Sequence, residues 1–114
     1  MTIIDTAFLA QAADAELEDW GPLAEATGDP MATHGLEIWV DGDRSAGIWQ
    51  CTAGPSYWVQ DENEVIYVLS GRMTVTPDGG EPKEIKAGDV AVFPVGWKGT
   101  WELHETVRKV YSIF

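Results

Sequence analysis

The sequence predicts an all-β domain, and three observations support this class. Runs of β-branched and aromatic residues, such as residues 65–69, recur at intervals of roughly 8–12 residues. Turn residues separate these runs, most clearly at residues 77–80, where Pro-Asp-Gly-Gly is a strong hairpin signal. A helical pattern occurs only near the N-terminus. Together these features are typical of an antiparallel sandwich or barrel that carries a short helical arm.

The N-terminal residues 1–30 are predicted to form an acidic, partly helical arm. Asp5 can cap a short amphipathic helix, which is expected to stop near residues 20–22, because Trp-Gly-Pro disfavours further helical turns. The apolar face of this helix would hold Phe8, Leu9, Ala12 and Ala13. Residues 31–114 then form the β-barrel.

Nine strands are predicted in residues 31–114 from the apolar runs and their flanking turns. They cover residues 36–40, 46–52, 57–60, 65–69, 73–76, 83–86, 90–93, 100–104 and 107–114. His34 lies in the turn-rich stretch before the first of these strands. Gly71 permits a tight bend between two later ones.

Length and charge limit the classes of function. The 114 residues suit one domain, and the net charge of −12 is uneven: all seven basic residues lie at Arg44 or beyond, whereas ten of the nineteen acids precede it. This distribution argues against nucleic acid as a partner, since a polyphosphate requires a basic surface. No apolar run is long enough to span a membrane, and the N-terminus lacks the basic residues that begin a signal peptide. The sequence therefore predicts a cytoplasmic protein without a membrane partner. The single cysteine, Cys51, is expected in a buried strand.

Two short motifs dominate the middle of the chain. The first contains Glu64, six further residues and Gly71, and the second contains Gly88-Asp89, Phe93-Pro94 and Gly96. This pattern resembles the two motifs of the cupin superfamily. The segments GIWQCTAG, DENEVIYVLSGRMTVTPDGGEP and AGDVAVFPVGWKGTWELHETVRKVY are similar to single-domain cupins of unknown function that are grouped with ureidoglycine aminohydrolase. The resemblance, from about Trp20 onward, implies a single cupin barrel, which is a double-stranded β-helix of jelly-roll type, and a homodimer.

The same resemblance implies where a metal site would lie. Cupins that bind a divalent metal use two histidines and a glutamate from the first motif and one histidine from the second. In this chain the glutamate is Glu64, and Gly99 stands at the third histidine position. The histidine pair falls on Tyr57 and Val59 or, in the other register, on Trp58 and Gln60. Three of the four ligands are therefore missing in either register.

Oxygen ligands from Gln60, Glu62 and Glu64 are the remaining option for a metal. Such a set would prefer a hard cation and would bind transition metals poorly. No cofactor is therefore expected, and a tight divalent-metal site is disfavoured.

The aromatic residues favour an interior cavity or a solid core. The resemblance implies that position 99 points inward, and strand alternation then places Trp101 and Leu103 on the same side as Gly99. By the same alternation Glu64, Ile66 and Val68 share the inward face. The tryptophans either fill the interior or line a pocket for a small organic ligand. The candidate ligand-binding residues are Trp49, Trp58, Gln60, Glu64, Trp97 and Trp101. Glu64 is the candidate catalytic acid or base, unless its carboxylate only bonds to a turn at the mouth of the barrel.

Three further polar residues have weaker assignments. His104 is expected on the polar face of its strand. Arg108 and Lys109 must point to opposite faces of the last strand, and one of them can pair with a buried carboxylate, for which Glu105 is the near candidate.

Three functions remain open at this point. The leading one is a small-molecule-binding cupin without a tight metal, with weak catalysis by Glu64 as an option. The second is a metal-dependent enzyme that acts on C–N bonds of a ureide or amino compound, as the family resemblance implies. The third is a non-catalytic dimeric scaffold. A homodimer is also expected physically, because a small sandwich exposes strand edges that an acidic arm can cover.

Overall fold

The computed structural model describes residues 2–114, which form ten β-strands and no helix. The strands are β1 (Glu18–Pro22), β2 (Ala32–Asp41), β3 (Arg44–Cys51), β4 (Gly54–Val59), β5 (Glu64–Ser70), β6 (Arg72–Pro77), β7 (Lys83–Lys86), β8 (Val90–Phe93), β9 (Lys98–Leu103) and β10 (Val107–Ile113). The all-β class is confirmed. Within the described residues, no helix is long and apolar enough to cross a membrane.

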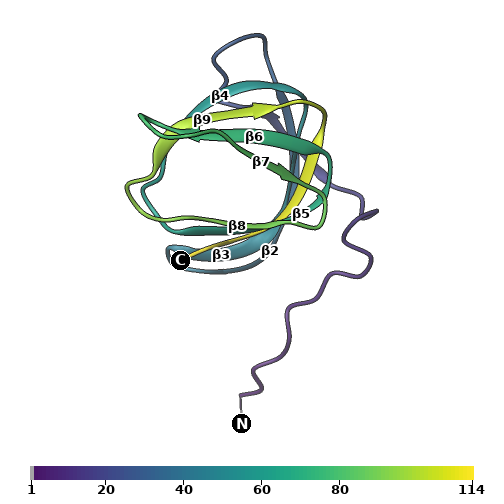
Figure 1. Ribbon diagram of the computed structural model, residues 1–114. Helices are drawn as coiled ribbons and strands as arrows, with labels where there is room; N and C mark the ends of the chain where they lie inside the picture. Colours follow the sequence, from purple (N-terminus) through teal and green to yellow (C-terminus); the bar gives the residue numbers. More distant parts are fainter. Residues whose placement is uncertain (1) are drawn as a thin grey trace.

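The strands form two antiparallel sheets that face each other. One sheet has six strands in the order β1-β2-β3-β10-β5-β8, and the other has four in the order β4-β9-β6-β7. Figure 1 shows the two sheets curving around a common interior. Strand β10 lies in the middle of the larger sheet, where it pairs with β3 on one side and β5 on the other. Side chains that point inward from β10 therefore reach the centre of the molecule.

The expectation of a closed barrel was wrong. The short strands β7 and β8 each have four residues and lie at the edges of different sheets, with no ladder between them. Closure would require continuous hydrogen bonding from one sheet to the next around the whole circumference. The architecture is instead an open sandwich of two sheets, and β8 presents one free edge.

The core lies between the inner faces of the two sheets. Alternation along β5 buries Glu64, Ile66 and Val68, as predicted from the sequence. Alternation along β9 likewise buries Gly99, Trp101 and Leu103, which confirms the inward direction of Trp101. The largest fully buried side chain is that of Trp101. Its indole therefore lies in the core among buried side chains from both sheets.

The predicted N-terminal helix was also wrong. Residues 2–17 form neither helix nor strand, and Figure 1 shows this arm running away from the body of the protein. Arg108 donates from Nη1 to the carbonyl oxygens of Ala12 (3.0 Å) and Ala15 (2.9 Å), oxygens that a continuing helix would use itself. A short helix without a packed apolar face is marginal in water. Here the side chains of Ile3, Ile4 and Phe8 are at least 79% exposed.

Two details at the start of the sheet also differ from the sequence-based expectation. Residues 18–22 form the edge strand β1, which pairs with β2, so the predicted arm contributes a strand to the larger sheet. Strand β2 begins at Ala32, which places His34 within a strand rather than in a loop.

The predicted bend at Gly71 is confirmed, because its φ of 90° lies in the left-handed region that favours glycine.

Candidate functional site

A buried ion pair lies in the interior at the centre of the larger sheet. Lys109 of β10 donates from Nζ to Oε2 of Glu64 on β5 at 2.9 Å. Lys109 is 3% exposed and Glu64 8% exposed, so both charges have lost most of their water. Removing two charges from water is costly, and each group here depends on the other for compensation. The sequence had suggested Glu105 as the partner of a basic residue on β10, which is wrong.

Two indole rings complete the surroundings of the Lys109 ammonium. Its Nζ lies 4.5 Å from the ring centroid of Trp49 and 4.5 Å from that of Trp101. An ammonium group over an aromatic face is attracted by the ring quadrupole, and the attraction grows when water is excluded. One carboxylate and two aromatic faces therefore hold the charge of Lys109.

The tryptophans of the interior pack against one another in a defined order. Trp58 stacks on Trp101 with centroids 4.6 Å apart, and Trp49 meets both rings edge-on at 6.4 Å. Ser56 fixes this arrangement, because its Oγ accepts from Trp58 Nε1 at 2.8 Å and donates to the carbonyl oxygen of Trp101 at 3.3 Å. The cluster thus joins β3 to β4 and β9 across the sandwich.

The ion pair and two of these indoles border an open cavity of about 390 Å³. Its lining residues are Trp20, Glu37, Ser45, Trp49, Trp58, Gln60, Glu64, Lys109, Tyr111 and Ile113. Four of the residues singled out in the sequence therefore lie together here: Trp49, Trp58, Gln60 and Glu64. Trp101 lies behind them, fully buried, in contact with Trp58. The interior is consequently neither a solid core nor an empty barrel.

Trp97 is not part of this group. It packs edge-on against Phe93 at 5.0 Å and lines a second cavity of about 450 Å³ at the edges of β7 and β8. That cavity includes Lys83, Glu84 and Asp89 but lacks a buried ion pair. We therefore regard the first cavity as the candidate site.

The donor set does not fit the metal site that the cupin resemblance implies. Trp58 and Gln60 point to the interior, whereas Tyr57 and Val59 are exposed, so an indole and an amide stand where a histidine pair would be. At Gly99 a β-carbon would overlap the Thr76 carbonyl oxygen, which leaves no room for a histidine. Among residues 2–114, no group of three or more His, Cys, Asp or Glu side chains could hold a metal ion.

Lys109 adds a further reason why a divalent ion does not fit at Glu64. Its ammonium already engages the one carboxylate that the resemblance supplies, and a metal at this carboxylate would have to displace a buried cation. The third oxygen considered from the sequence, that of Glu62, belongs to an exposed turn outside the lining of the cavity. No chemical step through a metal is derived for this site.

Sequence reasoning missed several residues of the cavity, above all Lys109. Alternation along the last strand placed Lys109 and Arg108 on opposite faces, but it could not show which face was inward. Tyr111 follows Lys109 on the same inward face, and burial raises the pKa of its phenol, with Glu37 and Glu64 adding to the effect. The sequence itself left this open, because each face of the strand carries one basic residue, Lys109 beside Val107 and Tyr111 and Arg108 beside Val110.

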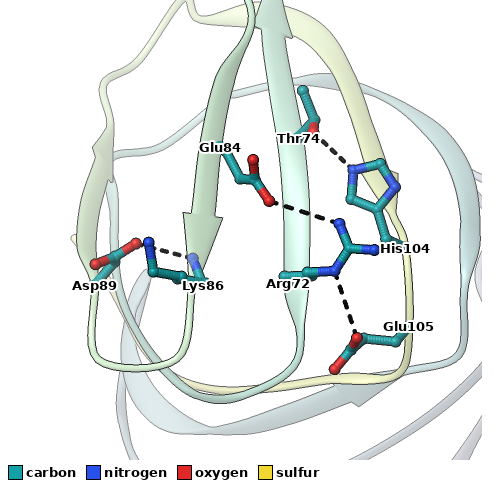
Figure 2. A network of polar contacts seen from close by, with 7 residues as sticks. All are labelled: Arg72, Thr74, Glu84, Lys86, Asp89, His104 and Glu105. Atoms are coloured by element: carbon teal, nitrogen blue, oxygen red, sulfur yellow. Dashed lines mark hydrogen bonds and ion pairs between the residues drawn. The ribbon is translucent and has the colours of Figure 1, made fainter.

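Charged residues also gather on the outer face of the four-stranded sheet, as Figure 2 shows. Arg72 lies 3.6 Å from carboxylate oxygens of both Glu84 and Glu105. The ring of His104 bonds to Thr74 Oγ1 at 2.7 Å, which confirms the expected surface position of this histidine. None of these side chains lines the candidate cavity.

Cys51 takes no part in the chemistry of the cavity. The residue is fully buried at the end of β3, as predicted, and burial raises the pKa of its thiol to about 11. A thiol that stays protonated at neutral pH is a weak nucleophile.

Comparison with known proteins agrees with this architecture. The model of the EutQ-like cupin domain matches residues 40–111 of the chain. No curated protein sequence matches it. A protein of unknown function from Pseudomonas syringae, assigned to the DUF861 family, superposes with a TM-score of 0.81 at 18% identity. That superposition covers 90% of this chain but only 46% of the Pseudomonas protein, so the present chain spans about half of that relative.

Two further solved structures extend the comparison. Ethanolamine utilization protein Q from Salmonella typhimurium is 26% identical with a TM-score of 0.67, covering 82% of this chain and 76% of its own. A DUF861 family protein from Thermotoga maritima is 37% identical with a TM-score of 0.57, covering 59% and 76% respectively. The match to this family model and the likeness to these solved structures show that the two facing antiparallel sheets form a cupin domain. The chain belongs to the family of EutQ-like cupin domains.

Proposed function

We propose that this protein binds a small organic molecule in the cavity bordered by Trp49, Trp58 and the Glu64–Lys109 pair. The observation that carries the proposal is a compensated but nearly dry ion pair at the wall of an open cavity of about 390 Å³. Ligand sites are usually concave and aromatic, with a few fixed polar groups.

The site supports binding more strongly than catalysis. Glu64 has an acid or base role only if a ligand proton comes within hydrogen-bond reach, and Lys109 already occupies one of its oxygens. The grouping with ureidoglycine aminohydrolase, and with it a metal-dependent reaction at a C–N bond, remains a prediction from the resemblance. Stoichiometric Mn, Ni, Fe or Zn after purification without chelator would favour that alternative.

A screen of chemically diverse small molecules by tryptophan fluorescence tests the proposal. We expect at least one compound to give a saturable change, because Trp49 and Trp58 line the cavity. The response should disappear in Trp58→Ala and persist in Trp39→Ala, since Trp39 is exposed on β2. Trp58→Phe serves as a milder variant if Trp58→Ala folds poorly.

The scaffold alternative predicts the opposite result of this screen. No saturable response to any compound, or a response that survives unchanged in both Trp58 variants, would reject the proposed binding site.

We also propose a homodimer in the cytoplasm, without nucleic-acid or membrane partners. The support for the dimer is the set of exposed apolar side chains on the arm (Ile3, Ile4 and Phe8) and on the edge strand β8 (Val90 and Val92). Exposed apolar edges of this kind favour association between copies. A monomer by light scattering at micromolar concentration would reject it.

A further inference from the structure

We infer that the ligand of this cavity is an uncharged, planar molecule with an amide-type edge, that is, a carbonyl acceptor beside an N–H donor. Amides, lactams and ureas share this edge. The inference rests on the proposed function and names the class of ligand for the same site.

The charges around the cavity disfavour an ionised ligand. Glu64 and Lys109 compensate each other at 2.9 Å, so the inner wall offers no free charge. An anion would meet the carboxylates of Glu64 and Glu37, and a cation would meet the Lys109 ammonium. Glu37 is exposed, so a cation held there would remain in water and gain little from the cavity. An ionised ligand would also lose hydration on entry, and the inner wall offers it no unpaired charge in return.

One lining residue has a donor without an acceptor. Gln60 Nε2 is buried and has no hydrogen-bond partner among residues 2–114. The backbone holds Gln60 in place, because its N–H donates to the Trp97 carbonyl oxygen at 2.9 Å and its carbonyl accepts from Gly96 N–H at 2.8 Å. A buried donor that lacks an acceptor is costly, and a ligand oxygen would remove that cost.

Glu64 supplies the complementary acceptor on the same cavity. Lys109 engages Oε2, and the other oxygen of the carboxylate can still accept a hydrogen bond from a ligand N–H. Gln60 and Glu64 thus contribute one donor and one acceptor to the lining of the same cavity, which is the complement of an amide edge. The indoles of Trp49 and Trp58 complete the match, because flat rings and amide planes stack well on aromatic faces.

Three ring compounds of nearly equal size test the inference: benzamide, benzoate and benzylammonium. By isothermal titration calorimetry at neutral pH, we expect saturable binding of benzamide and at least about tenfold weaker binding of both charged analogues. Gln60→Glu turns the free donor into an acceptor and adds a negative charge, so it should lower the benzamide affinity at least about tenfold. The matched control is Gln11→Glu, which makes the same change on the exposed arm and should leave the affinity unaltered.

The outcomes distinguish the ligand class inferred here from the broader proposal that the cavity binds a small organic molecule. Benzoate or benzylammonium binding as tightly as benzamide would overturn the ligand class, as would an unchanged affinity in folded Gln60→Glu or no benzamide binding at millimolar concentration. None of these results would reject the cavity as a ligand site, which fails only if the broader fluorescence screen finds no compound sensitive to Trp58.

Discussion

The inner and outer surfaces of this sandwich both carry ion pairs, but their surroundings differ. Inside, Lys109 and Glu64 meet at 2.9 Å with side chains that are 4% and 11% exposed. Outside, Arg72 lies 3.6 Å from Glu84 and Glu105 with all three side chains at least 50% exposed (Figure 2). Water screens the outer charges, whereas the inner pair has replaced water with a partner and two indole faces. The contrast shows that position, rather than residue type, makes the inner pair a candidate site.

The largest expected effect is on the inner pair. Lys109→Met leaves the Glu64 carboxylate buried without a partner, which should lower the free energy of unfolding by about 3–5 kcal/mol. Urea denaturation followed by circular dichroism measures the change. The cause would be the uncompensated charge, since methionine retains most of the packing volume of the lysine stem.

The double variant Glu64→Gln/Lys109→Met isolates this cause. With both charges gone, most of the lost stability should return, because replacing a buried pair entirely costs far less than breaking it. If Lys109→Met is as stable as the natural protein, or if the double variant is no better than the single one, the pair does not have the energetic role assigned to it.

A second effect concerns Gly99, where the backbone leaves no space for a side chain. Its β-carbon would meet the Thr76 carbonyl oxygen and would lie 2.8 Å from Pro77 Cα, so Gly99→Ala should destabilise the fold by about 1–3 kcal/mol. Thermal denaturation provides the measurement. Gly28→Ala is the matched control, because the nearest atom there is a proline side-chain carbon at 3.3 Å. Equal stability of the two variants would show that position 99 can accept a side chain after all.

A third effect is the protection of the buried thiol. Burial raises the pKa of Cys51 from 9.0 to about 11, so the folded protein holds the thiol proton more tightly than the unfolded chain does. This contribution to stability is complete below pH 9 and is lost as the pH rises toward 11. A disulfide reagent at mildly alkaline pH should therefore label the native protein much more slowly than the urea-unfolded chain. Equal labelling rates would contradict the buried position.

The smallest effect is expected on the outer face. Arg72→Ala removes both exposed ion pairs and should change the free energy of unfolding by less than about 1 kcal/mol, a change that added salt reduces further. The measurement uses the same urea denaturation as for Lys109→Met. A loss comparable with that of the inner pair would remove the distinction between the two surfaces.

Much of the fold could be predicted because strand periodicity is local. All nine predicted strands are present, with ends that differ by a few residues. Alternation showed which residues share a face with Glu64 and Trp101, and the family resemblance at position 99 indicated that this face was inward. Strand β1 was missed because residues 18–22 alternate weakly and become a strand only by pairing with β2. The helix failed for a similar reason, since the Arg108 contacts to Ala12 and Ala15 come from the far end of the chain.

The candidate site was less predictable because it depends on contacts across strands. Glu64 and four tryptophans were proposed from the sequence, and the structure brings Trp49 and Trp58 to the cavity with Trp101 behind them, while Trp97 lies elsewhere. Lys109 was the main omission. Its partner lies 45 residues away in the sequence. The ladder between β5 and β10 pairs Lys109 with Val68 and Glu64 with Ile113, so the two side chains meet along the inner face and not at a directly paired position.

The central claim is that the Glu64–Lys109 pair forms one wall of a working ligand site. The most direct test is a crystal structure of the protein, purified without chelator and soaked with the best compound from the fluorescence screen. The account predicts density for that compound against Trp58, with Lys109 still bonded to Glu64. Density for a divalent ion on Glu64 with Lys109 turned away, or a compound bound at another surface, would contradict it.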